Sequence, residues 1–226
     1  MIELNHWNVT PKEAVRVQAR MRELARIDDD FGEVTTVAGV DVKIGRGWKQ
    51  GSCGVVVLSF PQLEVIETRV HSAPVSFPYV PGLLAFREVP IFLETYELLR
   101  VKPDLLFFDG HGLAHPRRFG LACHAGVALD VPSIGCAKSK LIGEYQEPGI
   151  DAGSVSPLVA PEGDLIGEVV RTKAGVKPVF ISPGHRVSFA SATRFALACT
   201  RGHRIPEPTR LAHLVLEERG SSEGLT

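Results

Sequence analysis

Apolar residues recur along this 226-residue chain at the spacings of strands and helices. Residues 37–44 place apolar side chains at every second position, which is typical of a strand with one buried face. The segments 53–60 and 63–70 follow after short turns, so the three segments predict an antiparallel meander. Four large apolar residues at 105–108 predict a further strand that is buried on both faces.

Helical patterns lie before and after these strands. Thr10-Pro11-Lys12-Glu13 is a capping box that begins a helix predicted to run to about Ile27. Further helices are predicted over 83–100, 120–129, 188–200 and 209–218, and further strands over 133–137, 165–171 and 179–182. Pro90 is expected to break its helix or to start a second one at Ile91. This order predicts one α/β domain over residues 1–226, with a mixed sheet (a three-strand antiparallel meander plus parallel strands) flanked by helices on both faces.

The composition is that of an ordinary globular protein, with 44% hydrophobic and 23% charged residues. No apolar run approaches the roughly 20 residues needed to span a bilayer, and the first residues lack a secretory signal. A cytoplasmic location without a membrane partner is therefore expected. The four cysteines have no zinc-site spacing, so buried free thiols are expected. The net charge of -1 means that a polyanionic partner would be held by a local basic patch.

The strongest chemical signal lies directly after the fully buried strand. Asp109 follows that strand and is itself followed by Gly110 and Gly112. The carboxyl ends of such strands are where open α/β sheets bind ligands, and glycines allow a ligand to approach the backbone closely. An Asx turn that closes a core strand is the structural alternative.

Two further carboxylates are candidates for the same site. Asp41 interrupts an apolar strand, where it could instead pair with Lys43, and Glu88 could be an ordinary exposed glutamate of a helix. Three carboxylates at one sheet edge repel one another unless a cation joins them. Acidic sites of this kind suit Mg²⁺, and the chemistry they indicate is metal-assisted hydrolysis of a phosphodiester.

Several long motifs resemble those of the endonuclease V family. The matching segments are 37–42, 78–88, 109–117, 137–139, 182–186 and 208–213. The resemblance covers nearly the whole chain and implies a ribonuclease H-like fold. It also implies a Mg²⁺-dependent deoxyribonuclease, with Mn²⁺ as a substitute, that nicks DNA at the second phosphodiester bond 3′ to deoxyinosine.

The resemblance also implies roles for individual residues. Asp41, Glu88 and Asp109 would hold Mg²⁺, and His213 would assist at a second metal or orient water. Lys138 follows an apolar strand, so its ammonium group could stabilise charge that develops on the scissile phosphate. A lysine at the end of a strand and a histidine on a solvent-facing helix are the structural alternatives for these last two residues.

Reading a base inside a duplex requires that the base leave the stack. Tyr79, held between Pro78 and Pro81, is expected to act as a wedge that fills the vacated space; packing on its own loop is the alternative. The backbone at Gly110 and Gly112 is expected to face the base. The other residues expected to bind the substrate are Gly82, Leu84, His115, Leu121 and Leu141.

The expected partner is deoxyinosine-containing DNA, double- or single-stranded, and the protein is expected to act as a monomer. Two alternatives stay open. The same chemistry could act on inosine in RNA, which depends on contacts to the 2′-hydroxyl that no motif reports. The chain could also be a non-catalytic binder of damaged nucleic acid, although a pure binder gains nothing from three acids that face phosphates.

Overall fold

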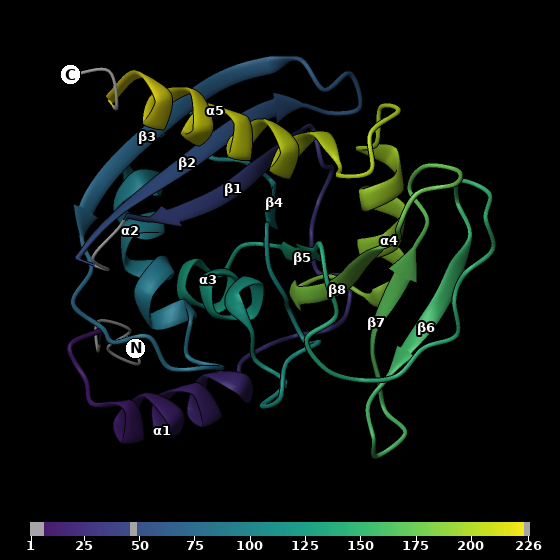
Figure 1. Cartoon of the computed structure of the whole chain (residues 1–226), viewed down its shortest axis with the longest axis horizontal. Coiled ribbons are helices and arrows are strands. Elements are labelled where there is room, and N and C mark those ends of the chain that lie inside the picture. The colour runs from purple at the N-terminus through teal and green to yellow at the C-terminus, as the bar shows by residue number, and fades with distance from the viewer. Residues whose placement is uncertain (1–6, 46–48, 224–226) are drawn as a thin grey trace.

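The computed structural model describes residues 7–45 and 49–223, which build an eight-stranded mixed sheet (Figure 1). The strand order is β3-β2-β1-β4-β5-β8-β7-β6. The strands are β1 (Thr36–Ile44), β2 (Gln50–Ser59), β3 (Val65–Pro74), β4 (Leu105–Phe108), β5 (Ser133–Ala137), β6 (Val155–Val159), β7 (Leu165–Val170) and β8 (Val179–His185). The first three strands form the predicted antiparallel meander, and β4 pairs in parallel with both β1 and β5. The predicted α/β fold class is confirmed.

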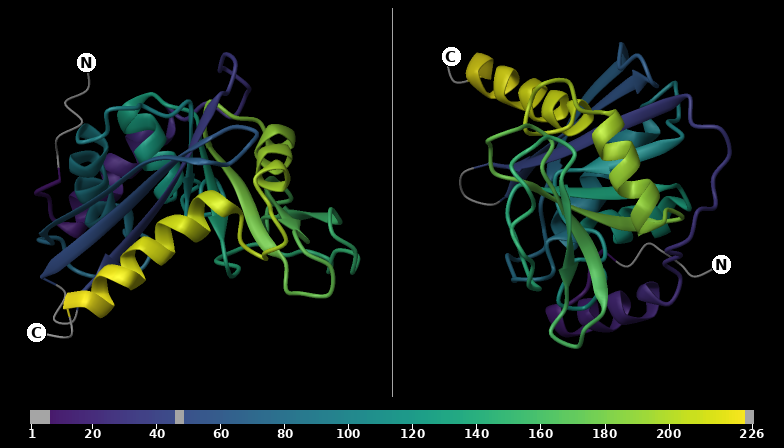
Figure 2. Two further views of the ribbon diagram at one scale, coloured as in Figure 1. Left: turned by 90° about the horizontal axis from the view of Figure 1, so that it is seen from above. Right: turned by 90° about the vertical axis from the view of Figure 1, so that its right-hand side faces the viewer.

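Helices cover both faces of the sheet (Figure 2). On one face lie α2 (Ala85–Glu97) and α3 (Leu121–Leu129), with α1 (Pro11–Arg22) packed against α3. On the other face lie α4 (Phe189–Ala198) and α5 (Glu207–Glu223). The neighbouring residues Phe107 and Phe108 of β4 belong to the two different cores, because successive side chains of a strand point to opposite faces.

The predicted break at Pro90 is wrong, because Pro90 lies inside the continuous helix α2. A proline at this position removes one hydrogen bond to the carbonyl of the preceding turn. The buried side chains of Val89, Ile91 and Phe92 pack into the core on this face of the sheet and hold the helix together. Tertiary packing therefore outweighs the local preference.

Other boundaries also differ from the predictions. Helix α1 ends at Arg22 instead of near Ile27, and α5 begins at Glu207. Strand β6 was not predicted, since Pro157 interrupts its pattern; it lies at an edge of the sheet, where proline is tolerated. The four cysteines are buried and free, as predicted. Within the described part of the chain, no helix is both long and apolar enough to cross a membrane.

Candidate functional site

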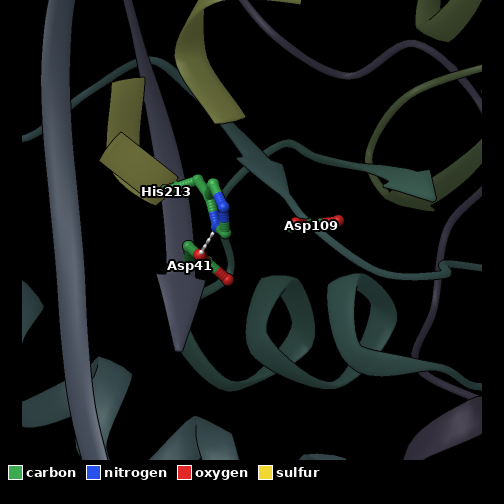
Figure 3. Close-up of side chains that lie close together, drawn as sticks. All are labelled: Asp41, Asp109 and His213. Atoms are coloured by element: carbon green, nitrogen blue, oxygen red, sulfur yellow. Dashed lines mark hydrogen bonds and ion pairs between the residues drawn. The ribbon is translucent and has the colours of Figure 1, made fainter. Parts of the chain in front are cut away.

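Asp41 and Asp109 meet because β1 and β4 run in parallel side by side. Val40 lies opposite Phe108 in the register, so the residues that follow them emerge at the same place. The backbone N–H of Asp109 donates a hydrogen bond to Val40 O at 3.1 Å, which continues the ladder. Both carboxylates lie beside His213 of α5 (Figure 3).

A glycine in β1 allows α5 to reach this position. A Cβ atom at Gly39 would lie 1.8 Å from Pro208 O and 2.7 Å from Thr209 N, so only glycine fits beneath the start of α5. The helix then places His213 Nδ1, which donates to Asp41 Oδ2 at 2.9 Å. Gly39 was not predicted as a functional position, although a glycine inside a strand is a known signal of close approach by another backbone.

Glu88 of α2 lies close enough to Asp41 and Asp109 for their charges to act on it, but it is outside the group of ligand atoms within 4.8 Å that the described residues form. Its residue is only 8% exposed, so the alternative of an exposed helix glutamate is wrong. Burial, and then the negative charges of Asp41 and Asp109, raise the pKa of Glu88 to about 8. Burial also raises the pKa of Asp109, although the ammonium group of Lys138 opposes that shift.

Two lysines that could pair with these acids have different partners. Lys138, which follows β5, forms an ion pair with Asp109. Lys43 pairs with Glu217 at 2.6 Å, so the alternative in which it neutralises Asp41 is wrong. Asp41 instead has His213 as its partner, and both Asp41 and Asp109 keep about 15% of their side-chain surface exposed.

The cluster fits a divalent cation. One ligand atom from each of Asp41, Asp109 and His213 lies within 4.8 Å of the others, and the buried Glu88 carboxyl interacts electrostatically with both aspartates. The carboxylate oxygens of Asp41 and Asp109 are donors that suit Mg²⁺ or Mn²⁺. A bound cation would also compensate the like charges that raise the pKa of Glu88.

An apolar pocket of about 290 Å³ adjoins this cluster. Its lining includes Gly110, next to Asp109, and Leu84, four residues before Glu88. The other predicted residues in its lining are Tyr79, Pro81, Gly82, His115, Leu121 and Leu141. Tyr79 is 59% exposed at the rim of this pocket.

Gly112 and Pro78 do not belong to the lining that the described residues give this pocket. The expectation that the backbone of Gly112 faces the pocket is therefore corrected. Its N–H donates to Ser182 Oγ at 2.8 Å, and a Cβ atom there would lie 2.2 Å from Pro183 O. Gly112 is needed for close packing of its loop against β8.

Other histidines have structural partners. His185 Nδ1 accepts a hydrogen bond from the Arg26 N–H at 3.3 Å, and its Nε2 donates to Asp130 at 2.9 Å. The side chain of His185 therefore joins β8 to the segment after α1.

The adjacent Cys123 and His124 form no nucleophilic pair. Burial raises the pKa of Cys123 to about 12 and lowers that of His124 to about 3.

Four polar residues that line the pocket were not predicted to bind the substrate: Gln18, His111, Ser139 and Lys140. Gln18 had a detectable signal, because it lies on the buried face of α1 together with Ala14 and Met21. A polar side chain on the apolar face of a helix usually has buried hydrogen-bond partners. His111 Nε2 donates to Ser139 O at 3.1 Å, and this hydrogen bond connects the loop after β4 to the loop after β5.

Comparison with known proteins shows similarity to one family. A family model described as Endonuclease V matches residues 18–214. A protein of Roseiflexus sp. named Endonuclease V is 47% identical over 206 residues, which cover 91% of each chain. Another of that name, from Trichormus variabilis, is 44% identical over 94% of this chain and 96% of its own.

Solved structures of the same name are also similar. Endonuclease V of Streptomyces avermitilis has a TM-score of 0.91 and 42% identity, covering 98% of this chain and 97% of its own. Endonuclease V of Ciona intestinalis, in complex with a 24-mer DNA containing an inosine followed by a ribo-adenosine, has a TM-score of 0.84. Its identity is 28%, covering 93% of this chain and 98% of its own.

Proposed function

Because this chain belongs to the endonuclease V family, we propose that it is a Mg²⁺-dependent DNA repair endonuclease that recognises deoxyinosine, the product of adenine deamination. We propose that it hydrolyses the second phosphodiester bond 3′ to the lesion. The observation that carries this proposal is the group of Asp41, Asp109 and His213, with the buried Glu88 close to both aspartates, next to a small apolar pocket. The inosine-containing DNA bound by the Ciona relative supports the choice of lesion.

In this proposal Asp41, Glu88 and Asp109 hold the cation, and His213 assists at a second metal or orients water. When bound, Mg²⁺ supplies the positive charge that activates water and offsets charge on the leaving oxygen. Lys138, already beside Asp109, offsets charge that develops on the scissile phosphate. The hydrogen bond to Asp41 fixes the ring of His213, so that its Nε2 faces a defined direction.

The pocket takes the extruded base. Leu84, Leu121 and Leu141 give it apolar walls, and the backbone at Gly110 lies at its surface to distinguish a 6-oxo from a 6-amino group. Tyr79 is exposed at the rim, between two prolines that restrict its loop, as a wedge for the vacated stack requires. Extrusion costs less from a weakly paired or single-stranded site, so single strands are also substrates.

The pocket and the acidic cluster both come from one chain, which supports action as a monomer with a single domain. A second candidate function is cleavage of RNA at inosine. The ribo-adenosine that follows the inosine in the DNA of the Ciona complex favours this candidate. A non-catalytic binder is less consistent with the site, because burying Glu88 beside two other acids serves no purpose in binding a polyanion.

The test uses matched DNA and RNA oligonucleotides that contain one inosine, incubated with the protein with and without Mg²⁺. The expected result is a Mg²⁺-dependent nick in DNA, with product ends at the second bond 3′ to the lesion. Cleavage of RNA alone would identify the second candidate as the function. Binding without cleavage on either substrate would contradict the nuclease proposal.

A further inference from the structure

A buried glutamine joins three segments behind the apolar pocket. Gln18 of α1 is 1% exposed. Its Nε2 donates to Gly82 O at 3.2 Å and to Phe119 O at 2.9 Å, while its Oε1 accepts a hydrogen bond from Arg117 Nε. Both N–H groups and the carbonyl oxygen of this side chain are therefore engaged, which fixes its orientation.

Arg117 reaches the same place from another direction. Its Nη2 also donates to Gly82 O, so this one carbonyl accepts hydrogen bonds from two side chains. Gly82 has a φ of +78°, and a Cβ atom there would lie 2.7 Å from Arg117 Nη2. The guanidinium thus packs directly against the glycine. We refer to Gln18 and Arg117 as the clamp.

The clamp connects the two walls of the pocket. One wall is the loop 79–82, which carries Tyr79 and belongs to no helix or strand. The other wall contains His115 and the start of α3 at Gly120 and Leu121. The hydrogen bonds of the clamp end on the carbonyl of Gly82, in one wall, and on the carbonyl of Phe119, which directly precedes Gly120 of the other wall. The width of the pocket is therefore set by groups that α1 and Arg117 provide.

We propose that Gln18 and Arg117 are positioning residues that hold the two walls at a fixed separation and so determine how well hypoxanthine is distinguished from adenine. This inference rests on the proposed function of the pocket as the site for the extruded base. The clamp acts on recognition more than on hydrolysis, because its hydrogen bonds end on the pocket walls, whereas the phosphodiester meets the acidic cluster.

Two conservative variants test the clamp. Gln18→Glu keeps the length of the side chain and an acceptor for Arg117, but it has no N–H for the Gly82 and Phe119 carbonyls. Arg117→Lys keeps the positive charge but loses the planar fork. Dissociation constants are measured for duplexes that contain hypoxanthine or adenine at one position, together with single-turnover nicking rates at saturating DNA.

We expect the preference for hypoxanthine to fall by about tenfold in each variant, the contribution of about one hydrogen bond. The nicking rate at saturating DNA should fall by less than about threefold. A matched control is Ser156→Ala on the strand β6. It removes a partly buried hydrogen bond from a buried side chain (to Gln146 O, at 2.5 Å) and should keep the wild-type preference.

Four outcomes would count against the proposals in different ways. An unchanged preference in both variants overturns the clamp. An equal loss in Ser156→Ala, in proportion to lost thermal stability, overturns it as well, because the effect would then be general destabilisation. If Arg117→Lys alone keeps the preference, Arg117 acts only through its charge and the clamp is overturned for that residue. A wild-type protein without a preference for hypoxanthine would instead contradict the proposed function.

Discussion

Replacing Gly39 by alanine should displace His213, although the two residues lie 174 positions apart. The added Cβ would lie 1.8 Å from Pro208 O, and real contacts of this kind are not shorter than 3.0 Å. The start of α5 therefore has to move away from β1 by at least 1.2 Å, because the obstacle is backbone and cannot rotate aside. If α5 moves as one body by this amount, the 2.9 Å hydrogen bond between His213 and Asp41 is lost, since such bonds have lengths of about 2.7–3.2 Å.

We expect Gly39→Ala to lower the free energy of unfolding by about 1–3 kcal/mol, which urea denaturation measures. Nicking of inosine-containing DNA should fall by about tenfold or more under conditions where the variant is folded. Gly54→Ala lies under the same helix with nearest contacts of 3.1 Å and should have a smaller effect.

The control is Gly32→Ala, which has no atom within 4 Å and should change stability by less than about 0.5 kcal/mol. If Gly39→Ala matched Gly32→Ala in both stability and nicking rate, the argument that this glycine positions the helix would be refuted.

Further predictions concern the proposed site itself. Asp109→Asn should abolish nicking while binding of lesion DNA is kept in gel-shift assays; nicking at the wild-type rate would exclude its role in holding the cation. Tyr79→Ala should weaken binding to matched duplex more than to single strands, whereas equal losses would argue against a wedge. Because the pKa of Glu88 is about 8 without a cation, this carboxyl group is mostly protonated in the folded metal-free protein at pH 7. Mg²⁺ binding should therefore release close to one proton, and the affinity for Mg²⁺ should increase as the pH rises to about 8. Calorimetry in two buffers of different ionisation enthalpy measures that proton, and Glu88→Gln should eliminate its release. Because the pKa of Glu88 is raised on folding, its contribution to the free energy of unfolding of the metal-free protein is fully present below about pH 4.5 and is lost as the pH rises through 8. Urea denaturation across this pH range measures the direction of the change.

The periodic spacing of apolar residues was enough to predict most elements of the fold. Alternation identified β1, and the fully apolar run identified β4 as a central strand, because burial on one or both faces leaves a direct mark on residue type. Asp109 was predicted as a ligand-site residue for the same reason, since it ends a buried strand. The predictions at Pro90 and β6 failed for two different reasons. Packing of α2 outweighs the tendency of Pro90 to break a helix, and the edge position of β6 lets a strand contain Pro157.

Only the tertiary structure decided how distant residues meet. The parallel register of β1 and β4 brings Asp41 to Asp109, and the bare backbone of Gly39 lets α5 bring His213 to both. The partners of Gln18 lie 64 to 101 residues away, so no local pattern could indicate them. Local spacing records which face of an element is buried, whereas the identity of the neighbour depends on strand order and on the close approach of backbones, which arise only when the whole chain packs.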